Sequence, residues 1–526
     1  MAEPDSRTPS SPLHDIRVVD LTTARGQLCG RVLADLGAEV LLIEPPSGLA
    51  ARRVGPFAPD GRSLFFESFA RGKASVALDL VADREAVLEL IDKADIVLES
   101  SGPGELVALG YGFAELSDRP GRERPLVYTS ITPFGQSGPH AGNPATDLTI
   151  EAAAGQVAMQ GTGARSPIPV SVPLASLNGS VQAAADTLMA LRHRDRVGVG
   201  QHLDTSMQAA MVWSTMSASG FFPVDGRDAP QSDQRRTRGP RDIAPGTTLP
   251  LIERCADGWV YLTMPILGRV STDSFAALMA WLHEEAPMPK VVAEVDWGMW
   301  LINLFGGKVG GDEIASGIAL LREFLATKTK QEIHSRALQD RILMAPLNDA
   351  ADLLADPHLV ERGLWTGLGE AQRVGTWAHL SATPMQPGTT APEIGSSRNG
   401  WGPSIVAATP LRKESAVPDD GGGIFGDLKV ADFSWAAAGP VITRTLADHG
   451  ATVVKVESQA RPDNMRFMGP FKDAKRGTDR SFPAANMNVS KLGLALDFSS
   501  DDGRQVAAEL IDWADVVVEN FAPGVM

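Results

Sequence analysis

A basic stretch in the last part of the chain has residue types that could hold an anionic ligand. Between Arg461 and Lys491 there are seven Lys and Arg side chains against three Asp. The stretch from Arg52 to Lys73 is similar, with five basic residues against two acidic ones. Clustered guanidinium and ammonium groups bind phosphate through charge-assisted hydrogen bonds. A solvated basic loop would give the same pattern, so charge alone leaves both a phosphate site and a plain surface loop open.

The charge of the whole chain limits what such a site could bind. With 48 basic and 64 acidic residues the net charge is −16, which opposes nucleic-acid binding. The nine histidines do not cluster at ligand spacing, and the only cysteines are Cys29 and Cys255. We therefore predict neither a metal site nor a disulfide, and we expect both thiols to be reduced and packed.

Known catalytic and targeting signatures are absent from the sequence. No Gly-x-Gly-x-x-Gly follows the first predicted strand, and there is no Walker loop, Gly-x-Ser-x-Gly or His-Glu-x-x-His. The start, Met1 to His14, is polar, contains three prolines and lacks the pattern of a signal peptide. No apolar run approaches the ~18 residues of a membrane span. These observations predict a cytoplasmic protein without a membrane segment.

The elements that must position the basic stretches form an alternating series of strands and helices. A buried strand at 17–21 is followed by a helix from Arg31 to Leu36 and a strand at 40–43. Further alternation predicts an α/β fold with a doubly wound, Rossmann-like parallel sheet, and a long Ala-rich helix is expected from Val181 to His193. Ligands bind at the carboxyl ends of the strands in such sheets, and both basic stretches follow strands.

Much of this pattern occurs twice. Ile16 to Glu44 recurs as Leu428 to Glu457, and Lys73 recurs as Lys491. Two βαβ units could agree by chance at apolar positions but not at charged ones in order, so we infer a duplicated domain. The second occurrence stops at Met526. We expect the natural protein to continue, because parallel strands without neighbours would leave apolar faces exposed.

Composition divides the chain into five segments. Pro, Gly and charged residues mark a boundary from Asp225, and Asp257-Gly258 beyond it predicts a hairpin turn. The predicted segments are a disordered start (1–14), a large domain called copy 1 (15–224), a smaller α+β domain with a return segment (225–393), a linker (394–423) and the incomplete start of a second large domain called copy 2 (424–526).

Several short motifs are weak one by one but occur in a characteristic order. They are Leu33-Ala-Asp-Leu-Gly-Ala-Glu-Val40, Ser130-Ile-Thr-Pro-Phe134-Gly135-Gln-Ser-Gly138, Gly198-Val-Gly-Gln-His-Leu-Asp204 and Glu519-Asn520-Phe521-Ala-Pro-Gly524. In this order and spacing the sequence resembles the family III CoA-transferases, which include formyl-CoA:oxalate and carnitine CoA-transferases and α-methylacyl-CoA racemase. The resemblance covers about Asp15 to Pro392 as one unit and Gly426 to Met526 as the opening part of another.

The resemblance implies a catalytic aspartate that copy 1 lacks. In the family this carboxylate attacks an acyl-CoA to form a mixed anhydride and then an aspartyl-CoA thioester, and the acceptor acid reverses the steps. It lies in a Val-Pro-x-Ala-Asp segment, which reads Val172-Pro-Leu-Ala-Ser176 here. No histidine nearby in sequence suggests a base for a serine nucleophile, so Ser176 is interpreted as an inactive replacement. The histidine of the racemase branch is replaced by Thr146, although Asp147 is retained.

For contacts with CoA, the resemblance favours copy 2. Asn520-Phe521 matches the family pair beside the pantetheine, where copy 1 has Ser100-Ser101. Two structural explanations for this pair stay open beside CoA contact: Asn520 could cap a turn, and Phe521 could belong to the core. The predicted CoA-binding residues are Ala437, Ala438, Asn488, Lys491, Asn520 and Phe521 in copy 2, and Lys73, Phe134 and Gly135 in copy 1.

The sequence thus predicts a fused CoA-transferase that moves CoA between an acyl-CoA and a free carboxylic acid. The catalytic Asp is expected in a continuation of copy 2. CoA is expected as a substrate, with no metal, nucleic acid or membrane partner. The family's interlocked homodimers imply either a homodimer or a pseudo-dimer within one chain. A non-catalytic acyl-CoA-binding scaffold stays open, as does a racemase or lyase of the same superfamily.

Overall fold

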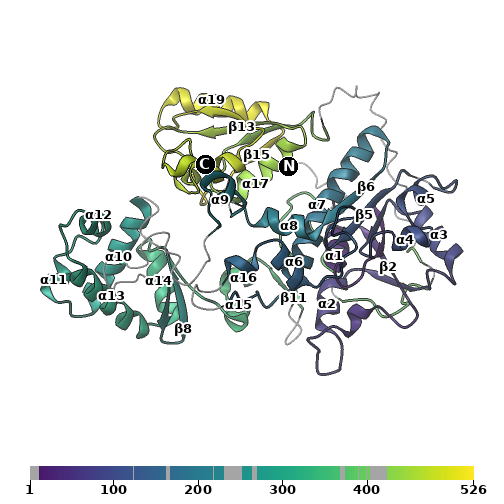
Figure 1. The fold of residues 1–526 in the computed structure, drawn as a ribbon, viewed down its shortest axis with the longest axis horizontal. Helices are drawn as coiled ribbons and strands as arrows, with labels where there is room; N and C mark the ends of the chain where they lie inside the picture. The colour runs from purple at the N-terminus through teal and green to yellow at the C-terminus, as the bar shows by residue number, and fades with distance from the viewer. Residues whose placement is uncertain are drawn as a thin grey trace, which may run out of the picture.

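The computed structural model describes most of the chain. The described residues are 11–122, 124–160, 166–216, 218–229, 251–263, 269–367, 373–388, 390–398, 400–402 and 423–526. Most of the predicted disordered start, most of the predicted boundary region after Asp225, and residues 403–422 of the predicted linker lie outside them. Figure 1 shows copy 1 in purple to blue, the smaller domain in teal and copy 2 in yellow-green.

Copy 1 is built on a six-stranded sheet. The strands run in the order β3-β2-β1-β4-β5-β6, and every neighbouring pair is parallel. Four of them are buried along nearly their whole length, as expected for parallel strands covered on both faces. The predicted doubly wound α/β fold is therefore confirmed. The strands are β1 (Arg17–Leu21), β2 (Glu39–Glu44), β3 (Ala74–Ala77), β4 (Ile96–Glu99), β5 (Val127–Thr132) and β6 (Gln201–Ser206).

Helices cover both faces of this sheet. Val18 belongs to a core cluster that includes residues of α1, α7 and α8, and Val19 to a cluster that includes residues of α3, α4 and α5. Successive strand residues thus point to opposite layers. The helices of copy 1 are α1 (Gln27–Asp35), α2 (Leu64–Ala70), α3 (Arg84–Asp92), α4 (Glu105–Ala108), α5 (Phe113–Ser117), α6 (Asp147–Ala153), α7 (Leu174–Val197), α8 (Met207–Ser214) and α9 (Phe221–Asp225).

Two helices start earlier than predicted. α1 begins at Gln27, and Gly30 lies inside it, where a Cβ would come within 2.3 Å of Asp20 Oδ2. α7 begins directly after Pro173, and its C-cap Gly198 has a φ of 72°. Ser176 therefore lies in the first turn of a 24-residue helix.

The smaller domain has its own core, in which Trp297 and Trp300 lie among aliphatic side chains. Cys255 pairs with Gly258, so Ala256 and Asp257 form the hairpin turn and Gly258 already opens a strand. Its strands are β7 (Ile252–Cys255), β8 (Gly258–Leu262), β9 (Met344–Pro346), β10 (Trp365–Thr366) and β11 (Arg373–Val374). Its helices are α10 (Arg269–Glu285), α11 (Lys290–Ala293), α12 (Trp300–Phe305), α13 (Gly311–Ala326), α14 (Lys330–Gln339), α15 (Ala350–Ala355) and α16 (Pro357–Glu361).

Copy 2 repeats the first four strands of copy 1. Its sheet has the order β14-β13-β12-β15, which corresponds to β3-β2-β1-β4. The register also corresponds, since Leu42 lies opposite Ser75 and Lys455 lies opposite Gly493. The elements are β12 (Lys429–Asp432), α17 (Ala438–Asp448), β13 (Thr452–Glu457), α18 (Phe482–Met487), β14 (Leu492–Ala495), α19 (Asp501–Trp513) and β15 (Val516–Val518).

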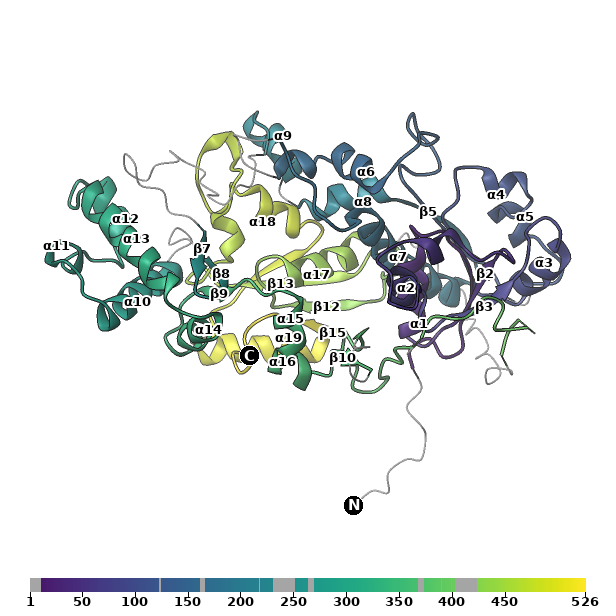
Figure 2. The ribbon, with the colours of Figure 1, turned by 90° about the horizontal axis from the view of Figure 1, so that it is seen from below.

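Copy 2 packs against the α7–α9 side of copy 1 (Figures 1 and 2). The Arg444 guanidinium lies 4.5 Å from the centre of the Trp213 ring. A Cβ at Gly220 would come within 2.2 Å of the Phe482 ring, so the two chain segments meet closely there. Figure 2, turned by 90°, shows α17 and β12 near the middle of the molecule.

Both cysteines are free and buried, and burial raises the pKa of each thiol. This agrees with the predicted packed thiols. Within the described residues, no three His, Cys, Asp or Glu side chains come together as a metal site would require. No helix in the same part of the chain combines the length and apolar character needed to cross a membrane.

Candidate functional site

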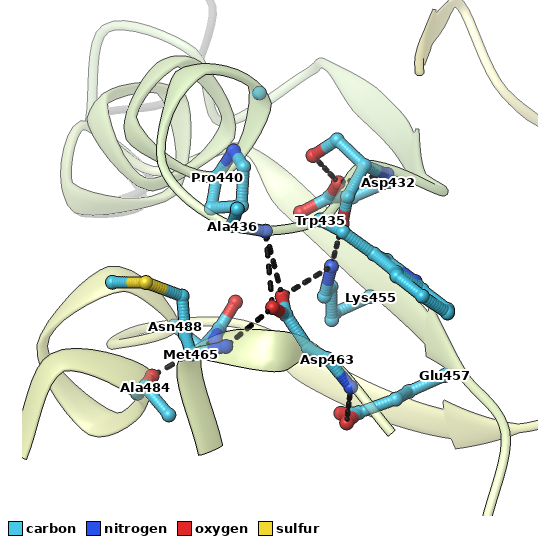
Figure 3. A network of polar contacts seen from close by, with 12 residues as sticks. Asp432, Trp435, Ala436, Pro440, Lys455, Glu457, Asp463, Met465, Ala484 and Asn488 are labelled. Atoms are coloured by element: carbon cyan, nitrogen blue, oxygen red, sulfur yellow. Dashed lines mark hydrogen bonds and ion pairs between the residues drawn. The ribbon is translucent and has the colours of Figure 1, made fainter. Parts of the chain in front are cut away.

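The loop after β12, residues 434–437, is fixed by side chains from elsewhere in copy 2. Ala436 has a φ of 58°, a left-handed conformation that is uncommon for residues other than glycine. Its N–H donates to both carboxylate oxygens of Asp463, at 3.0 and 3.1 Å (Figure 3). Asn520 accepts from the Trp435 N–H and donates to the Trp435 carbonyl, both at 2.8 Å. Backbone strain held in place by its surroundings is a common feature of ligand sites.

Asp463 is the centre of this network. It is 1% exposed, and its Oδ1 also accepts from the Met465 N–H at 2.9 Å. Lys455 lies on β13, and its Nζ is 3.8 Å from Asp463 Oδ2. The same Nζ donates to the Ser434 carbonyl. Figure 3 shows Lys455 and Asp463 facing each other beneath the loop. A buried carboxylate and a buried ammonium group thus hold the strained turn from below.

A second buried pair lies deeper in copy 2. Lys491 Nζ is 3.0 Å from Asp432 Oδ2, and the two side chains are 1% and 0% exposed. Burial opposes the negative charge of Asp432, but Lys455 and Lys491 outweigh it and lower the pKa of that carboxyl. Lys491 also donates to the Pro440 carbonyl and to Asn488 Oδ1, both at 3.1 Å. Its ammonium group therefore points into the fold.

A hollow of about 600 Å³ opens beside this network, between β13, the loop after it and β14. Arg466 lines it and is held by Glu457 through two hydrogen bonds of 2.6 and 2.8 Å. Burial opposes the charge of Glu457, but these bonds outweigh it and lower its pKa. Four cations of the basic stretch from Arg461 to Lys491 form no ion pair with any carboxylate of the described residues. These are Arg461, Lys472, Lys475 and Arg476. The local charge that the sequence indicated is thus partly uncompensated.

Four of the predicted residues of copy 2 follow the carboxyl ends of β12 and β15, namely Ala437, Ala438, Asn520 and Phe521, whereas Asn488 and Lys491 precede β14. Several of the six have internal partners. Ala438 is exposed at the start of α17, and Ala437 precedes it. Asn520 uses both polar atoms of its amide on Trp435, which is the predicted turn-capping alternative. Phe521 is half-buried and lies edge-on to the Trp435 ring at 5.3 Å. The two aromatic rings and Ala438 provide an apolar surface next to the loop.

Asn488 and Lys491 bracket the turn that leads into β14. Asn488 donates to the Ala484 carbonyl at 2.8 Å and accepts from Lys491. Ser490, which lies between them, has a φ of 63°. The pair is thus placed to fix the shape of this turn.

In copy 1, Lys73 points inward like its counterpart. Its Nζ donates to Asp20 at 2.8 Å and to the carbonyl and side-chain oxygens of Gln27 at 2.7 and 2.9 Å. The Lys73 and Asp20 side chains are both 0% exposed. Gln27 supplies the amide oxygen that Asn488 supplies in copy 2.

Phe134 and Gly135 lie at the carboxyl end of β5. Gly135 has a φ of 92°, and the next N–H, of Gln136, donates to both oxygens of Asp204 at 2.9 Å. Phe134 packs against the copy 1 core. These two residues therefore form a tight turn at the edge where ligands bind in such sheets.

Ser176 is bonded to a carboxylate from α6. Its N–H donates to Asp147 Oδ1 at 2.7 Å, and its Oγ donates to Asp147 Oδ2 at 2.9 Å. Glu151, one turn later, accepts from the Leu174 N–H at 3.1 Å, and burial raises its pKa despite this bond. Two carboxylates of copy 1 thus occupy N–H groups at the start of α7, the position where the family nucleophile was expected.

Sequence reasoning missed Lys455, Asp463 and Trp435 as site residues. A signal was present, because copy 1 has Leu42 where copy 2 has Lys455 in the same strand register. Leu49 corresponds to Asp463, since their N–H groups donate to the matching carboxylates of Glu44 and Glu457. A charged residue that replaces a buried leucine between duplicated strands is unusual and marks a specific role.

Comparison with known proteins places these features in a family. Residues 13–398 and 425–526 both match the model of CoA-transferase family III. A probable CoA-transferase of Mycobacterium tuberculosis is 30% identical over 507 residues, which cover 94% of this chain and 59% of that protein. The BbsE subunit of succinyl-CoA:(R)-benzylsuccinate CoA-transferase from Thauera aromatica is 30% identical over 66% of this chain and 82% of its own length.

Solved structures agree on the fold. The crystal structure of a CaiB/BaiF family protein from Brucella suis superposes with a TM-score of 0.61 at 23% identity. The match covers 74% of this chain and 97% of that one. By comparison, this chain spans little more than half of the mycobacterial relative.

Proposed function

The chain belongs to CoA-transferase family III, and on that basis we propose that it serves the transfer of CoA from an acyl-CoA to a free carboxylic acid. The observation that carries the proposal is the strained loop after β12, fixed by Asp463 and Asn520 at the carboxyl edge of the copy 2 sheet. A basic stretch follows the neighbouring strand. An acyl-CoA presents both a phosphate end and a long pantetheine arm, which suit these two features.

The proposed CoA site uses the exposed parts of this edge. Trp435, Ala438 and Phe521 offer apolar surface for the pantetheine arm. The uncompensated cations of the basic stretch attract the phosphates. Asn488 and Lys491 act indirectly, because their polar atoms already bond within the fold and shape the turn before β14.

In the proposed reaction an aspartate carboxylate attacks the thioester carbonyl, and CoA leaves as its thiolate while a mixed anhydride forms. The thiolate then attacks the acyl carbon of the aspartyl side, which releases the donor acid and leaves an aspartyl-CoA thioester. The acceptor carboxylate reverses both steps. We assign this aspartate to the second of the two family units and give copy 1 a structural role, because the Ser176 hydroxyl donates to the Asp147 carboxylate and no histidine lies near Ser176 in the sequence.

The same observation supports a second candidate, a non-catalytic acyl-CoA-binding protein. The contacts of copy 2 with α7–α9 further support a pseudo-dimer within one chain. Mass spectrometry distinguishes the two candidates. Incubation of the full-length protein with an acyl-CoA should give a covalent adduct on an acidic residue if it is a transferase, and only reversible binding if it is a scaffold.

Calorimetric titration with CoA tests the site itself. The double variant Lys455→Leu/Asp463→Leu gives copy 2 the residues of copy 1 and should weaken CoA binding by at least about tenfold, or roughly 1.4 kcal/mol. Ser176→Ala is the matched control in copy 1 and should leave the affinity unchanged. A surface variant, Lys475→Ala/Arg476→Ala, should weaken binding and flatten its salt dependence without disturbing the buried network. Equal affinities in all four proteins would exclude this edge as the CoA site.

A further inference from the structure

A segment that spans the end of the predicted return segment and the start of the predicted linker crosses the copy 1 sheet, and copy 2 shows no counterpart to it in the described residues. We call residues 390–398 the strap. It contains a turn, in which the Ser396 N–H donates to the Glu393 carbonyl at 3.1 Å and Gly395 has a φ of 62°. The strap crosses the outer edge of β3, which is an edge strand of the six-stranded sheet. The Ser397 N–H donates to the Ser75 carbonyl at 2.8 Å, and the Gly395 N–H donates to Ser75 Oγ at 3.1 Å. At its other end the Thr390 carbonyl accepts from the Gly72 N–H at 3.1 Å. The strap thus covers this edge and pairs its Ser75 carbonyl.

The strap also fills the space between β3 and the loop after β2. Arg52 donates to the Pro392 carbonyl at 2.9 Å. Ile394 lies directly over Gly48, where a Cβ would come within 2.8 Å of its Cδ1. Ala391 packs against the small cluster of Leu42 and its neighbours. The strap is therefore anchored by its backbone to Ser75 of β3 and to Gly72, and by the Ile394 side chain over the loop after β2.

The corresponding surface of copy 2 is open. Strand register equates Ser75 with Gly493, and the shared Glu–Arg pair equates Arg52 with Arg466. Both of these copy 2 residues line the hollow of about 600 Å³, as do Pro462 and Ala495. A Cβ at Gly493 would meet nothing within 4 Å, and Leu492 is 61% exposed. The hollow is thus the groove that the strap occupies in copy 1.

We propose that this groove in copy 2, lined by Pro462, Arg466, Gly493 and Ala495, binds a second peptide segment with the turn and the chemistry of the strap. A backbone N–H of the segment bonds to a carbonyl at the outer edge of β14, and its turn presents an aliphatic side chain like that of Ile394. Arg466 is placed to bind one of its carbonyls, as Arg52 does in copy 1. Gly493 has no hydroxyl, so copy 2 cannot offer the acceptor that Ser75 Oγ provides to the Gly395 N–H in copy 1. The other bond is retained, in which the N–H at the position of Ser397 donates to the strand carbonyl.

The part of the strap needed for this binding is short. Beyond residue 398 copy 1 uses Trp401, which donates to the Leu90 carbonyl at 3.2 Å and lies 5.3 Å from Arg17. In copy 2 the residue that corresponds to Arg17 is Lys429, and it lies 5.7 Å from Trp513 of the same copy. In copy 2 the Trp513 ring therefore already occupies the place next to Lys429 that Trp401 occupies next to Arg17. A peptide of residues 386–398, which omits Trp401, is thus a sufficient probe of the groove.

The test is a titration of the 526-residue protein with a fluorescent synthetic peptide of sequence 386–398, measured by anisotropy. Saturable binding is expected, together with slower amide hydrogen exchange in residues 488–496 and no change in residues 72–78, where the strap is already bound. N-methylation of the Ser397 amide in the peptide removes the retained donor and should lower the affinity at least about tenfold. A peptide with Ser397→Ala keeps that N–H and should bind as the parent does.

A variant that fills the groove completes the test. Gly493→Phe places a ring in the open space and should also lower the affinity at least about tenfold, whereas Gly142→Phe, at another position with free space around it, should not. Circular dichroism melts confirm that both variants are folded. Absence of saturable binding, exchange protection elsewhere, or indifference to N-methylation would each overturn the proposal. None of these outcomes depends on CoA binding, so the proposed function is tested separately.

Discussion

The two copies share a backbone but differ at the loop after the first strand. In copy 1, Leu42 and Leu49 pack in a small apolar cluster beneath this loop, and no residue of the loop has a positive φ. In copy 2 the same two positions hold Lys455 and Asp463, and Ala436 is left-handed. An apolar pair needs no exact partner geometry, whereas a buried ion pair is stable only when its hydrogen bonds are met. The difference shows that one copy can keep the fold with ordinary packing while the other uses it to hold a fixed loop.

What the copies share is equally informative. Asp20 with Lys73 and Asp432 with Lys491 form the same buried pair at the end of the first strand. A charge pair that is present in both copies supports a role in the scaffold. Sequence reasoning had assigned both lysines to CoA, and that assignment stays a prediction. The pair that differs between copies is the better guide to a site.

The largest expected effect comes from removing one member of the shared pair. Lys73→Met leaves Asp20 buried without a cation and should destabilise copy 1 by about 3–5 kcal/mol. Lys491→Met should cost less, roughly 1–3 kcal/mol, because Lys455 still lies near Asp432. Native-state hydrogen exchange of the β1 and β12 amides measures each copy separately. A greater loss in copy 2 would reverse the assignment of Lys455 as a second partner.

The next effect distinguishes a fixed loop from a packed one. Asp463→Ala leaves the Ala436 and Met465 N–H groups without their acceptor and removes a carboxylate that pairs with the buried Lys455, and it should destabilise the loop by about 2 kcal/mol. Leu49→Ala at the matching position should cost about 1 kcal/mol, since Leu49 is only partly buried. Exchange rates of the amides at 434–438 and at 22–26 report the two loops. The comparison fails if both substitutions leave these rates unchanged.

A smaller effect is expected at Ser176. Ser176→Ala removes the hydroxyl bond to Asp147 and should lower the free energy of unfolding by about 1 kcal/mol. Ser176→Asp introduces the residue that the family resemblance predicts there but sets a second carboxylate against Asp147, and it should destabilise copy 1 without creating an acyl adduct. Denaturation midpoints and mass spectrometry after incubation with acyl-CoA check the two statements. An adduct at position 176 would restore copy 1 as a catalytic unit.

The smallest expected effect is the loss of stability of copy 2 at acidic pH. The folded pKa values of Asp432 and Glu457 lie below their ordinary values, so their contribution to stability is present above the unfolded values of about 4 and is lost as pH falls through the folded ones. Opening of copy 2 should therefore increase between about pH 5 and pH 3. Asp432→Asn removes one of the two carboxylates, and its opening should depend less steeply on pH in the same exchange experiment.

Much of the architecture was predictable because it depends on local pattern. Alternating apolar strands and helices identify the parallel sheet, and the ordered recurrence of charged positions identifies the second family match at 425–526. The start of α7 was not predictable in this way, since Ser176 and the polar residues after it read as a loop. Only the carboxylates of Asp147 and Glu151, which bond to its first N–H groups, show how that end is satisfied.

By itself, the sequence determined the family and the repeated unit, and it predicted that Ser176 occupies the position of the family aspartate. Tertiary structure decided which polar residues are free to meet a ligand. Asn488 bonds to the carbonyl one turn before it, and the exposed Asn520 bonds to the backbone of Trp435. Lys73 and Lys491 turn inward to Asp20 and Asp432, because a polar group that is out of reach of water must find a partner inside the fold. Those partners come from distant segments, as the strap over β3 does, and one-dimensional spacing does not encode the direction of a side chain.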